Sequence, residues 1–173
     1  HRHGDVVGVA LDPPLDELGR LQASALAAAV GPVDRVISSP LRRTRETAAA
    51  FGVEVEVDDR WIELDYGELD GTPLGAVPPE MWQQWREDIG MRPPGGETLV
   101  ELGERVWSAL DDLAIHGSVR GRTTVIVTHV SPVKEATTLG AGFLAGLAVG
   151  TWSGWDGIAA TWKPHRTVNP GAP

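Results

Sequence analysis

Cysteine is absent from all 173 positions of the sequence, and its absence excludes several kinds of site. A chain without thiols has no disulfide scaffold, no cysteine nucleophile and no cysteine-ligated zinc or iron–sulfur centre. Long hydrophobic runs are missing as well, because the most apolar stretch, residues 141–152, is short and is interrupted by three glycines. We therefore expect a protein without a membrane anchor, and the lack of cysteine is compatible with a reducing, cytoplasmic location.

Basic side chains are scarce relative to acidic ones, 15 against 24, and the formal net charge is −9. A surface of this sign repels a phosphate backbone, so general nucleic-acid binding is not expected. The length suits one domain with a substantial core, and 42% hydrophobic with 23% charged residues is typical of a folded chain. We predict a single domain over residues 1–173.

Apolar runs typical of strands alternate with segments of helical period, which predicts an α/β domain with a mostly parallel sheet. We expect strands at residues 35–37, 53–57, 124–127 (a central one) and 158–162, followed by an irregular tail over 163–173. Helices are expected between Asp16 and Gly31, from Pro40 to about Phe51, and behind a capping box formed by Thr98 and Glu101. The first helix is predicted to bury Leu18, Leu21, Ala25, Leu26 and Ala29.

The stretch 61–96 contains most of the prolines, and we predict that it is an insertion forming a lid or pocket wall. Trp82 and Trp85 in this stretch fall on one helical face, which favours a packing role, with stacking on a flat leaving group as the alternative. For Arg86 and Arg92, exposed salt bridges are favoured over contact with a distal anionic group.

Two clusters of basic residues are candidates for binding an anion. The chain opens with Arg2, His3 and Gly4, which places an imidazole beside a permanent cation. A second cluster begins the helix expected from Pro40, and it consists of Arg42, Arg43 and Arg45. Cations at a helix N-terminus oppose the macrodipole unless an anion is bound there. The three side chains diverge, so only one or two can share a pocket, and a solvated face is the alternative.

Two further clusters are suited to proton transfer. Glu63 and Asp65 are candidates for a general acid or base if one of them is desolvated, and an acidic surface loop is the alternative. His129 leaves a buried strand at its carboxyl end, where open α/β sheets bind ligands, although a structural histidine is the commoner outcome.

Taken in order, these clusters resemble the histidine phosphatase family, which includes cofactor-dependent phosphoglycerate mutase. The resemblance covers roughly residues 1–135 and rests on Arg2-His3-Gly4, Pro14-Leu15, Glu17-Leu18-Gly19-Arg20, Ser39-Pro40-Leu41-Arg42-Arg43, Glu63-Leu64-Asp65-Tyr66-Gly67, Gly95-Gly96-Glu97-Thr98 and Thr128-His129. The segments Asp65-Tyr66-Gly67-Glu68 and Gly95-Gly96-Glu97-Thr98 are most similar to the small acid phosphatase branch typified by α-ribazole phosphatase.

The resemblance implies a three-layer α/β/α sandwich and assigns residues to each catalytic role. His3 would be the nucleophile that becomes a phosphohistidine. Arg2, Arg43 and His129 would surround the phosphoryl oxygens, and Glu63 would be the general acid. Substrate would also contact Gly4 and Val130. No metal and no cofactor are implied.

The sequence departs from the family at its start. The family places an apolar strand directly before the Arg-His-Gly motif, and we expect that strand to be missing from the sequence as numbered. The loop after Gly4 is short and carries Asp5, Val6 and Val7 where the family commonly has threonine and asparagine; it is either naturally short or lacks some residues.

The predicted activity is metal-independent hydrolysis of a small phosphorylated metabolite. Three alternatives stay open: a phosphoglycerate mutase, a phosphatase of phosphohistidine in a partner protein, and a degenerate module that binds phosphate without turnover. The natural substrate and the oligomeric state are not predicted.

Overall fold

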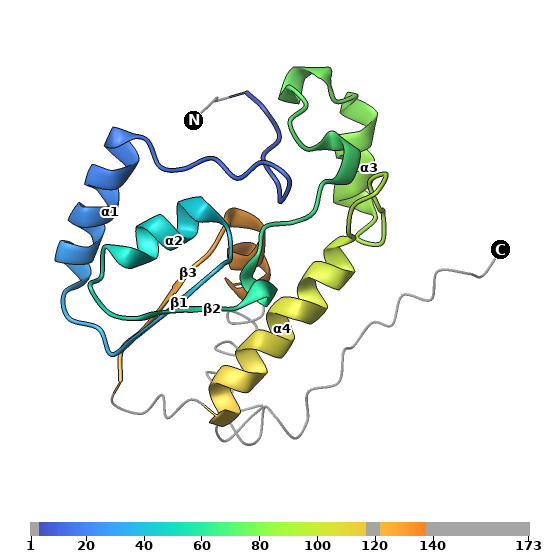
Figure 1. Cartoon of the computed structure of the whole chain (residues 1–173). Helices are drawn as coiled ribbons and strands as arrows, with labels where there is room; N and C mark the ends of the chain where they lie inside the picture. Colours follow the sequence, from blue (N-terminus) through green and yellow to red (C-terminus); the bar gives the residue numbers. More distant parts are fainter. Residues whose placement is uncertain (1–3, 117–121, 138–173) are drawn as a thin grey trace.

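The computed structural model describes residues 4–116 and 122–137, and it is an α/β fold built on a parallel sheet (Figure 1). The strands are β1 (Arg35–Ser38), β2 (Val55–Val57) and β3 (Thr124–Val127). The α-helices are α1 (Glu17–Val30), α2 (Arg42–Ala49), α3 (Pro79–Glu87) and α4 (Leu99–His116), and residues 130–137 are also helical. Three short 3-10 helices lie between β2 and α3: η1 (Asp59–Trp61), η2 (Gly67–Leu69) and η3 (Leu74–Ala76). Predictions for 158–162 and 163–173 fall outside the described residues.

The described sheet has the order β2-β1-β3, with all pairs parallel, so β1 is the middle strand. Val36 pairs with Val55 on one side and with Val125 on the other. The middle position explains why Val36 and Ile37 are buried, whereas all four residues of β3 are half-buried. The prediction of a parallel strand at 124–127 is confirmed, but its central position is wrong for the part of the sheet that the structure describes.

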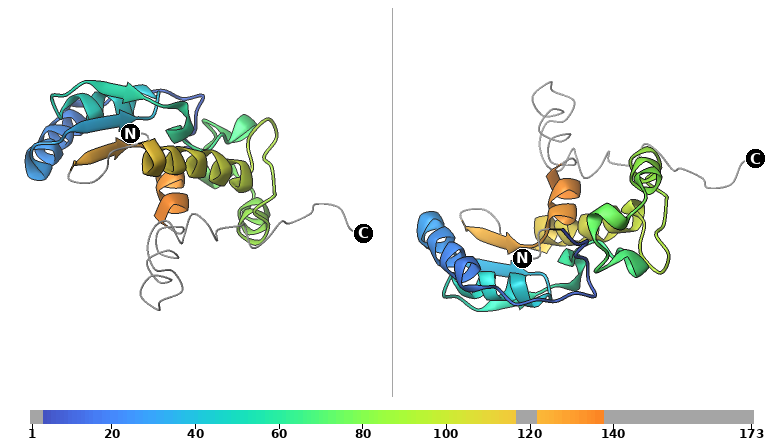
Figure 2. Two further views of the ribbon diagram at one scale, coloured as in Figure 1. Left: turned by 90° about the horizontal axis from the view of Figure 1, so that it is seen from below. Right: turned by 90° about the horizontal axis from the view of Figure 1, so that it is seen from above.

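Helices cover both faces of the sheet. Figure 2 shows α1 and α2 on one face and α4 on the other. Ile37 of β1 belongs to a core that α4 completes with Leu102 and Val106, both fully buried. The half-buried Ile126 of β3 packs against this core. This core also contains Trp61, which places the segment after β2 against α4. The layered arrangement agrees with the predicted fold class.

Helix α1 forms where the capping signals predicted it, but it buries a different face. The Asp16 carboxylate accepts a hydrogen bond from the Gly19 N–H at 2.7 Å, and Gly31 ends the helix with φ 81°. Ala23 is its buried residue, while Leu18 and Leu21 are 62% and 63% exposed. The predicted burial is therefore wrong for the whole set Leu18, Leu21, Ala25, Leu26 and Ala29, all of which are exposed. The helix packs on α2, and Ala23 rather than a leucine is the residue that it buries.

Helix α2 begins two residues later than predicted. Leu41 keeps an extended backbone, and its carbonyl accepts hydrogen bonds from the N–H groups of Thr44 and Arg45. Leu41 is therefore the N-cap, and Pro40 lies outside the helix. The helix ends at Ala49 rather than Phe51, and Gly52, with φ 71°, redirects the chain toward β2.

The capping box before α4 is confirmed. The Glu101 carboxylate accepts from the Thr98 N–H at 2.8 Å, and the Thr98 hydroxyl accepts from the Glu101 N–H at 3.1 Å. The same Glu101 carboxylate also pairs with Arg92 at 2.5 Å. The salt bridge favoured for Arg92 is thus confirmed, while the side chain of Arg86 lies outside the described part.

The two tryptophans of α3 are packing residues. Their rings stack with centroids 5.8 Å apart, and the ring of Trp85 meets that of Tyr66 edge-on at 5.4 Å. Trp85 is buried within the core, and Trp82 packs against that core from its edge. The packing interpretation is confirmed for both. None of the helices in the described ranges is long and apolar enough to cross a membrane.

Candidate functional site

The site begins where β1 and β3 end. Parallel pairing brings the carboxyl ends of both strands to one edge of the sheet, so residues 90 positions apart become neighbours. Ser39 directly follows β1, and its N–H donates to the Val127 carbonyl at 2.9 Å. Its Oγ lies 2.8 Å from Nε2 of His129, two residues beyond β3. The sequence analysis did not assign Ser39 a role of its own.

His129 is neutral in this environment. Burial lowers the pKa of its imidazole from 6.5 to about 3, and the positive charges of Arg43 and Arg105 act in the same direction. The Ser39 Oγ accepts a hydrogen bond from the Leu41 N–H at 3.4 Å, so its hydroxyl proton can go to Nε2. We assign the ring proton to Nδ1 on this basis. His129 can therefore donate one hydrogen bond without carrying charge.

Among the three arginines that begin α2, only Arg43 contributes to this cluster. Arg42 is exposed and pairs with Glu46 at 2.8 Å, and Arg45 is exposed. The predicted divergence of the three is therefore confirmed. The carboxylate of Asp12 accepts from the Arg42 N–H at 2.6 Å, so an internal anion occupies the N-terminus of α2.

The Arg43 guanidinium is half-buried and partly anchored. Its Nη1 donates to the Leu11 carbonyl at 2.9 Å, and its Nη2 donates to the Gly8 carbonyl at 3.1 Å. Burial lowers the pKa of this arginine, while Asp12 and Glu63 are among the acidic groups that oppose the shift. A guanidinium has five N–H donors, so this anchoring leaves donors for an anion.

The loop 5–16, whose carbonyls accept hydrogen bonds from Arg43, is itself held by side-chain hydrogen bonds. Both carboxylate oxygens of Asp70 accept backbone hydrogen bonds, from the Gly8 N–H at 2.8 Å and from the Ala10 N–H at 2.6 Å. A Cβ at Gly8 would lie 2.8 Å from a ring carbon of Tyr66, so a larger residue would displace the loop. The loop is thus fixed next to the acidic segment 63–70.

Glu63 is buried, with 7% exposure. Its Oε1 accepts hydrogen bonds from the Leu64 N–H at 2.8 Å and from the Ser131 N–H at 3.3 Å. The Thr128 hydroxyl donates to the Trp61 carbonyl at 2.6 Å, which ties the segment before Glu63 to the end of β3. These contacts hold a carboxyl group against the residues that flank His129.

Asp65, the other acidic candidate, has a structural role. It is half-buried, and its Oδ1 accepts from the Gly67 N–H at 2.8 Å in a tight turn where Gly67 adopts φ 55°. The structure therefore distinguishes the two carboxylates, which the sequence left as rivals.

Of the predicted catalytic residues, Arg43 interacts electrostatically with both Glu63 and His129, and Glu63 accepts from the N–H of Ser131, two residues beyond His129. Arg2 and His3 lie outside the described residues. Gly4 is half-buried, and its carbonyl accepts from the Leu74 N–H at 2.6 Å. Val130 is 65% exposed at the start of the helix 130–137.

Tyr66 was also absent from the predicted site. Burial raises the pKa of its phenol, the charges of Glu63 and Asp70 raise it further, and a hydrogen bond with Ser131 opposes the shift. The phenol is thus a neutral hydroxyl close to Glu63. Its place in the Asp-Tyr-Gly segment was the only sequence signal that could have indicated it.

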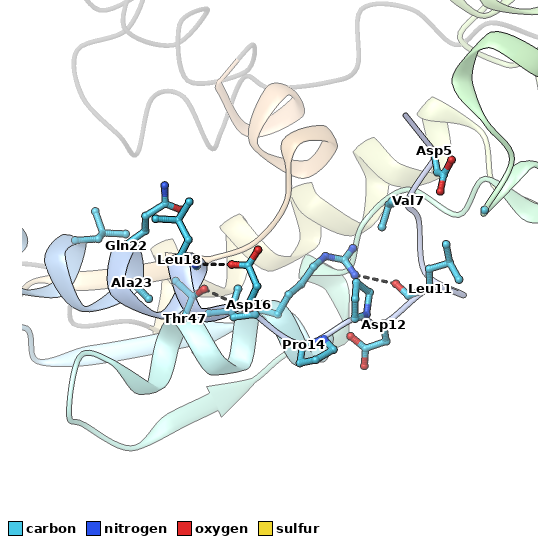
Figure 3. Close-up of a pocket in the computed structure, with 16 residues that line it drawn as sticks. Asp5, Val7, Leu11, Asp12, Pro14, Asp16, Leu18, Gln22, Ala23 and Thr47 are labelled. Carbon is cyan, nitrogen blue, oxygen red and sulfur yellow. Dashed lines mark hydrogen bonds between the residues drawn. The ribbon is translucent and has the colours of Figure 1, made fainter. Parts of the chain in front are cut away.

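A cleft of about 930 Å³ lies beside this cluster, between the loop 5–16 and helix α1 (Figure 3). Arg43 lines it, together with Asp5, Asp12, Asp16 and Leu18. Neither Glu63 nor His129 is part of its lining, so the cleft adjoins the cluster through Arg43 alone. Across the described ranges, no group of three or more His, Asp or Glu side chains is placed to hold a metal ion.

The low pKa of His129 predicts a pH-dependent stability. The folded state resists protonation of this ring to about pH 3, whereas the unfolded chain takes up the proton near pH 6.5. Between these values the unfolded state binds more protons, so the free energy of unfolding falls as the pH drops from 6.5 toward 3. The slope from this one ring is at most about 1.4 kcal/mol per pH unit, and its partial exposure lowers it.

Urea unfolding at about pH 7 and about pH 5 measures this effect, with His129→Gln as the comparison. The loss of stability between the two pH values should be smaller in the variant, because glutamine does not titrate. An identical loss in both proteins would assign the pH dependence to other groups.

Comparison with known proteins gives a consistent family. A model described as the histidine phosphatase superfamily (branch 1) matches residues 1–143. A bifunctional protein of Mycobacterium tuberculosis is 34% identical over 133 residues, 71% of this chain and 36% of that protein. A probable phosphoglycerate mutase of Yersinia pestis is 37% identical over 128 residues, 64% of this chain and 59% of that protein. The chain thus spans less than two thirds of the length of these curated relatives.

Solved structures give a similar result. A mycobacterial glucosyl-3-phosphoglycerate phosphatase superposes with a TM-score of 0.71 at 28% identity, covering 80% of this chain and 72% of its own. A phosphoglycerate mutase from Thermus thermophilus superposes with a TM-score of 0.66 at 30% identity, covering 78% of this chain and 73% of its own. Phosphatases and mutases therefore both occur among the similar structures.

Proposed function

This chain belongs to the histidine phosphatase superfamily, branch 1, and from that premise we propose that it is a metal-independent phosphomonoesterase acting on a small phosphorylated metabolite. The proposal is supported by the contacts at the carboxyl edge of the sheet: Ser39 bonds to His129, the Ser131 N–H donates to Glu63, and Arg43 interacts electrostatically with both Glu63 and His129. Together Arg43, His129 and Glu63 supply a fixed cation, a neutral hydrogen-bond donor and a buried carboxyl group. These are the groups that a phosphoryl transfer without a metal needs around the reacting phosphorus.

In the first step the neutral imidazole of His3 attacks phosphorus, and the bond from phosphorus to the ester oxygen breaks. Glu63 gives its proton to the departing oxygen, so the alcohol leaves neutral and the phosphoryl group stays on His3. Arg2, Arg43 and the Nδ1–H of His129 stabilise the charge on the phosphoryl oxygens. Gly4 and Val130 border the same site.

In the second step Glu63, now a carboxylate, removes a proton from water. The water oxygen bonds to phosphorus, the bond from phosphorus to nitrogen breaks, and the electron pair returns to His3. Inorganic phosphate leaves and both residues regain their starting protonation. One carboxyl group thus serves both steps, and the contacts that separate Glu63 from Asp65 favour Glu63 for this work.

The Asp65-Tyr66-Gly67-Glu68 segment supports the small acid phosphatase branch typified by α-ribazole phosphatase. We therefore propose that the substrate is a small phosphate ester of the kind that this branch hydrolyses. The lack of cysteine supports a reducing, cytoplasmic location. A phosphoglycerate mutase is the second candidate, because curated relatives at 37% identity are described as probable phosphoglycerate mutases.

Measurements of phosphate release, phosphoryl transfer and phosphate binding separate these candidates. We expect the wild type to release inorganic phosphate from a generic aryl phosphate in excess chelator, and to transfer little of it to added monophosphoglycerate. Dominant transfer would identify a mutase. Release from a phosphohistidine protein but not from small esters would identify a phosphoprotein phosphatase. A folded protein that binds phosphate and turns over none of these would be the binding module.

A further inference from the structure

Arg105, in the second turn of α4, holds the backbone that carries Glu63. Its side chain is only 19% exposed, and the guanidinium donates to the carbonyls of Arg60 and Ile62, each at 2.8 Å. A third bond, from Nη2, reaches the carbonyl of Glu63 itself at 3.0 Å. One planar cation therefore fixes three carbonyls of the segment that ends in the proposed general acid.

Glu97 binds both Arg105 and the backbone of Asp65. Its two carboxylate oxygens accept from Arg105, at 2.6 Å from Nη2 and 3.1 Å from Nε, and the pair is largely buried. The same carboxylate accepts from the Asp65 N–H at 3.1 Å, and the Glu97 N–H donates to the Asp65 carbonyl at 2.9 Å. The backbone is thus held directly at Glu63 and again two residues later.

Both sets of contacts fix the backbone position of Glu63. The Glu63 side chain is buried, and its Oε1 also accepts from the Ser131 N–H, so its direction depends on where its own backbone lies. A displacement of about 1 Å in a reacting group can cost about a hundredfold in rate. Only a guanidinium can reach three carbonyls and a carboxylate at once, because an ammonium lacks the planar fork of donors.

We propose that the Arg105–Glu97 pair positions Glu63 for proton transfer to the leaving oxygen. Arg105 does not contact the reacting atoms in this proposal; it acts through the backbone of Glu63. The inference rests on the proposed function, because it assigns a role in the protonation step of that reaction.

The test compares two phosphate esters that differ in how strongly their departure depends on protonation of the leaving oxygen. Phenolate is a poor leaving group, so phenyl phosphate depends on the general acid, whereas the stable anion released from 2,4-dinitrophenyl phosphate does not. The readout is kcat/KM, because it reports the steps up to departure of the alcohol and excludes the second step, in which Glu63 also acts. Arg105→Gln should lower kcat/KM for phenyl phosphate by about a hundredfold. For the dinitrophenyl ester the fall in kcat/KM should be less than about fivefold. Glu63→Gln should show the same selective loss and serves as the reference.

Arg60→Gln is the matched control. The Arg60 side chain also ties η1 to α4, through Asp112 at 2.5 Å and Ser108 at 3.2 Å. Its backbone carbonyl, which Arg105 binds, is retained in the variant. We expect kcat/KM for both esters to stay within about twofold of the wild type, as for an exposed ion pair. Arg105→Lys is the second variant, because it keeps the charge if Arg105→Gln fails to fold, and it should show the same selectivity for phenyl phosphate.

The outcomes are distinct. An equal loss of kcat/KM on both esters, or no loss on either, would overturn the positioning role while leaving the phosphatase intact. A selective loss in Arg60→Gln as large as that in Arg105→Gln would also overturn it, since any link between η1 and α4 would then suffice. A folded wild type that hydrolyses neither ester would contradict the proposed function, and the inference with it.

Discussion

Replacing His3 with alanine is expected to lower phosphate release by at least about a thousandfold while the protein stays folded. The variant removes the atom that would accept the phosphoryl group, so the reaction would need direct attack by water. Arg43, Glu63 and His129 should remain in place, because their hydrogen bonds to Leu11, Ser131 and Ser39 are kept in the variant. The expected residual rate is therefore what the surrounding groups achieve without a nucleophile.

The measurement is the initial rate of phosphate release from phenyl phosphate in excess chelator. His1→Ala is the matched control, because it removes a histidine two positions away that lies outside the Arg-His-Gly motif. Circular dichroism and thermal unfolding verify the fold of both variants. A short incubation with radiolabelled ester should also leave an acid-labile phosphoryl group on the wild type but not on His3→Ala. Retention of more than about a tenth of the wild-type rate would exclude His3 as the nucleophile.

Local signals in the sequence predicted local structure well. The Thr98/Glu101 capping box and the Asp16 cap are side-chain to backbone interactions within one turn, so they depend on adjacent residues only. The burial of α1 failed for the opposite reason. Its apolar period shows which face is hydrophobic but not what that face meets. In the described structure α1 lies against α2 with Ala23 buried, while Leu18 and Leu21 stay exposed.

The candidate site shows the same difference between local signals, which predicted it, and long-range contacts, which the sequence did not reveal. Three side chains with the right chemistry, Arg43, Glu63 and His129, were predicted from their motifs. Their supporting contacts were not, because these join residues far apart in the chain: Ser39 meets His129 only through the pairing of β1 with β3. The N-terminus of α2 illustrates the point further. The arginines there suggested an external anion, whereas a carboxylate from the loop before α1 occupies that position.

Arg43→Lys is expected to lower kcat about a hundredfold, although the positive charge is kept. The guanidinium spans two loop carbonyls, of Leu11 and Gly8, and this anchoring sets the plane of the donors that remain for phosphate. An ammonium is a point charge on a flexible stem, so it cannot hold both carbonyls and still present paired donors to a phosphoryl group. The loss should fall mainly on kcat, because the phosphoryl charge spreads over its oxygens in the transition state.

Arg42→Lys provides the matched control on the same turn of α2. Arg42 is exposed and pairs with Glu46 along the helix, an interaction that lysine can replace with an effect on stability of about 0.5 kcal/mol or less. Its kcat and KM should equal those of the wild type. Thermal unfolding with and without inorganic phosphate adds a readout that is independent of turnover, since the stabilisation by phosphate should shrink in Arg43→Lys but not in Arg42→Lys. Equal activity and equal stabilisation by phosphate in the two variants would mean that Arg43 serves only to hold the loop 5–16, and that the phosphate lies elsewhere.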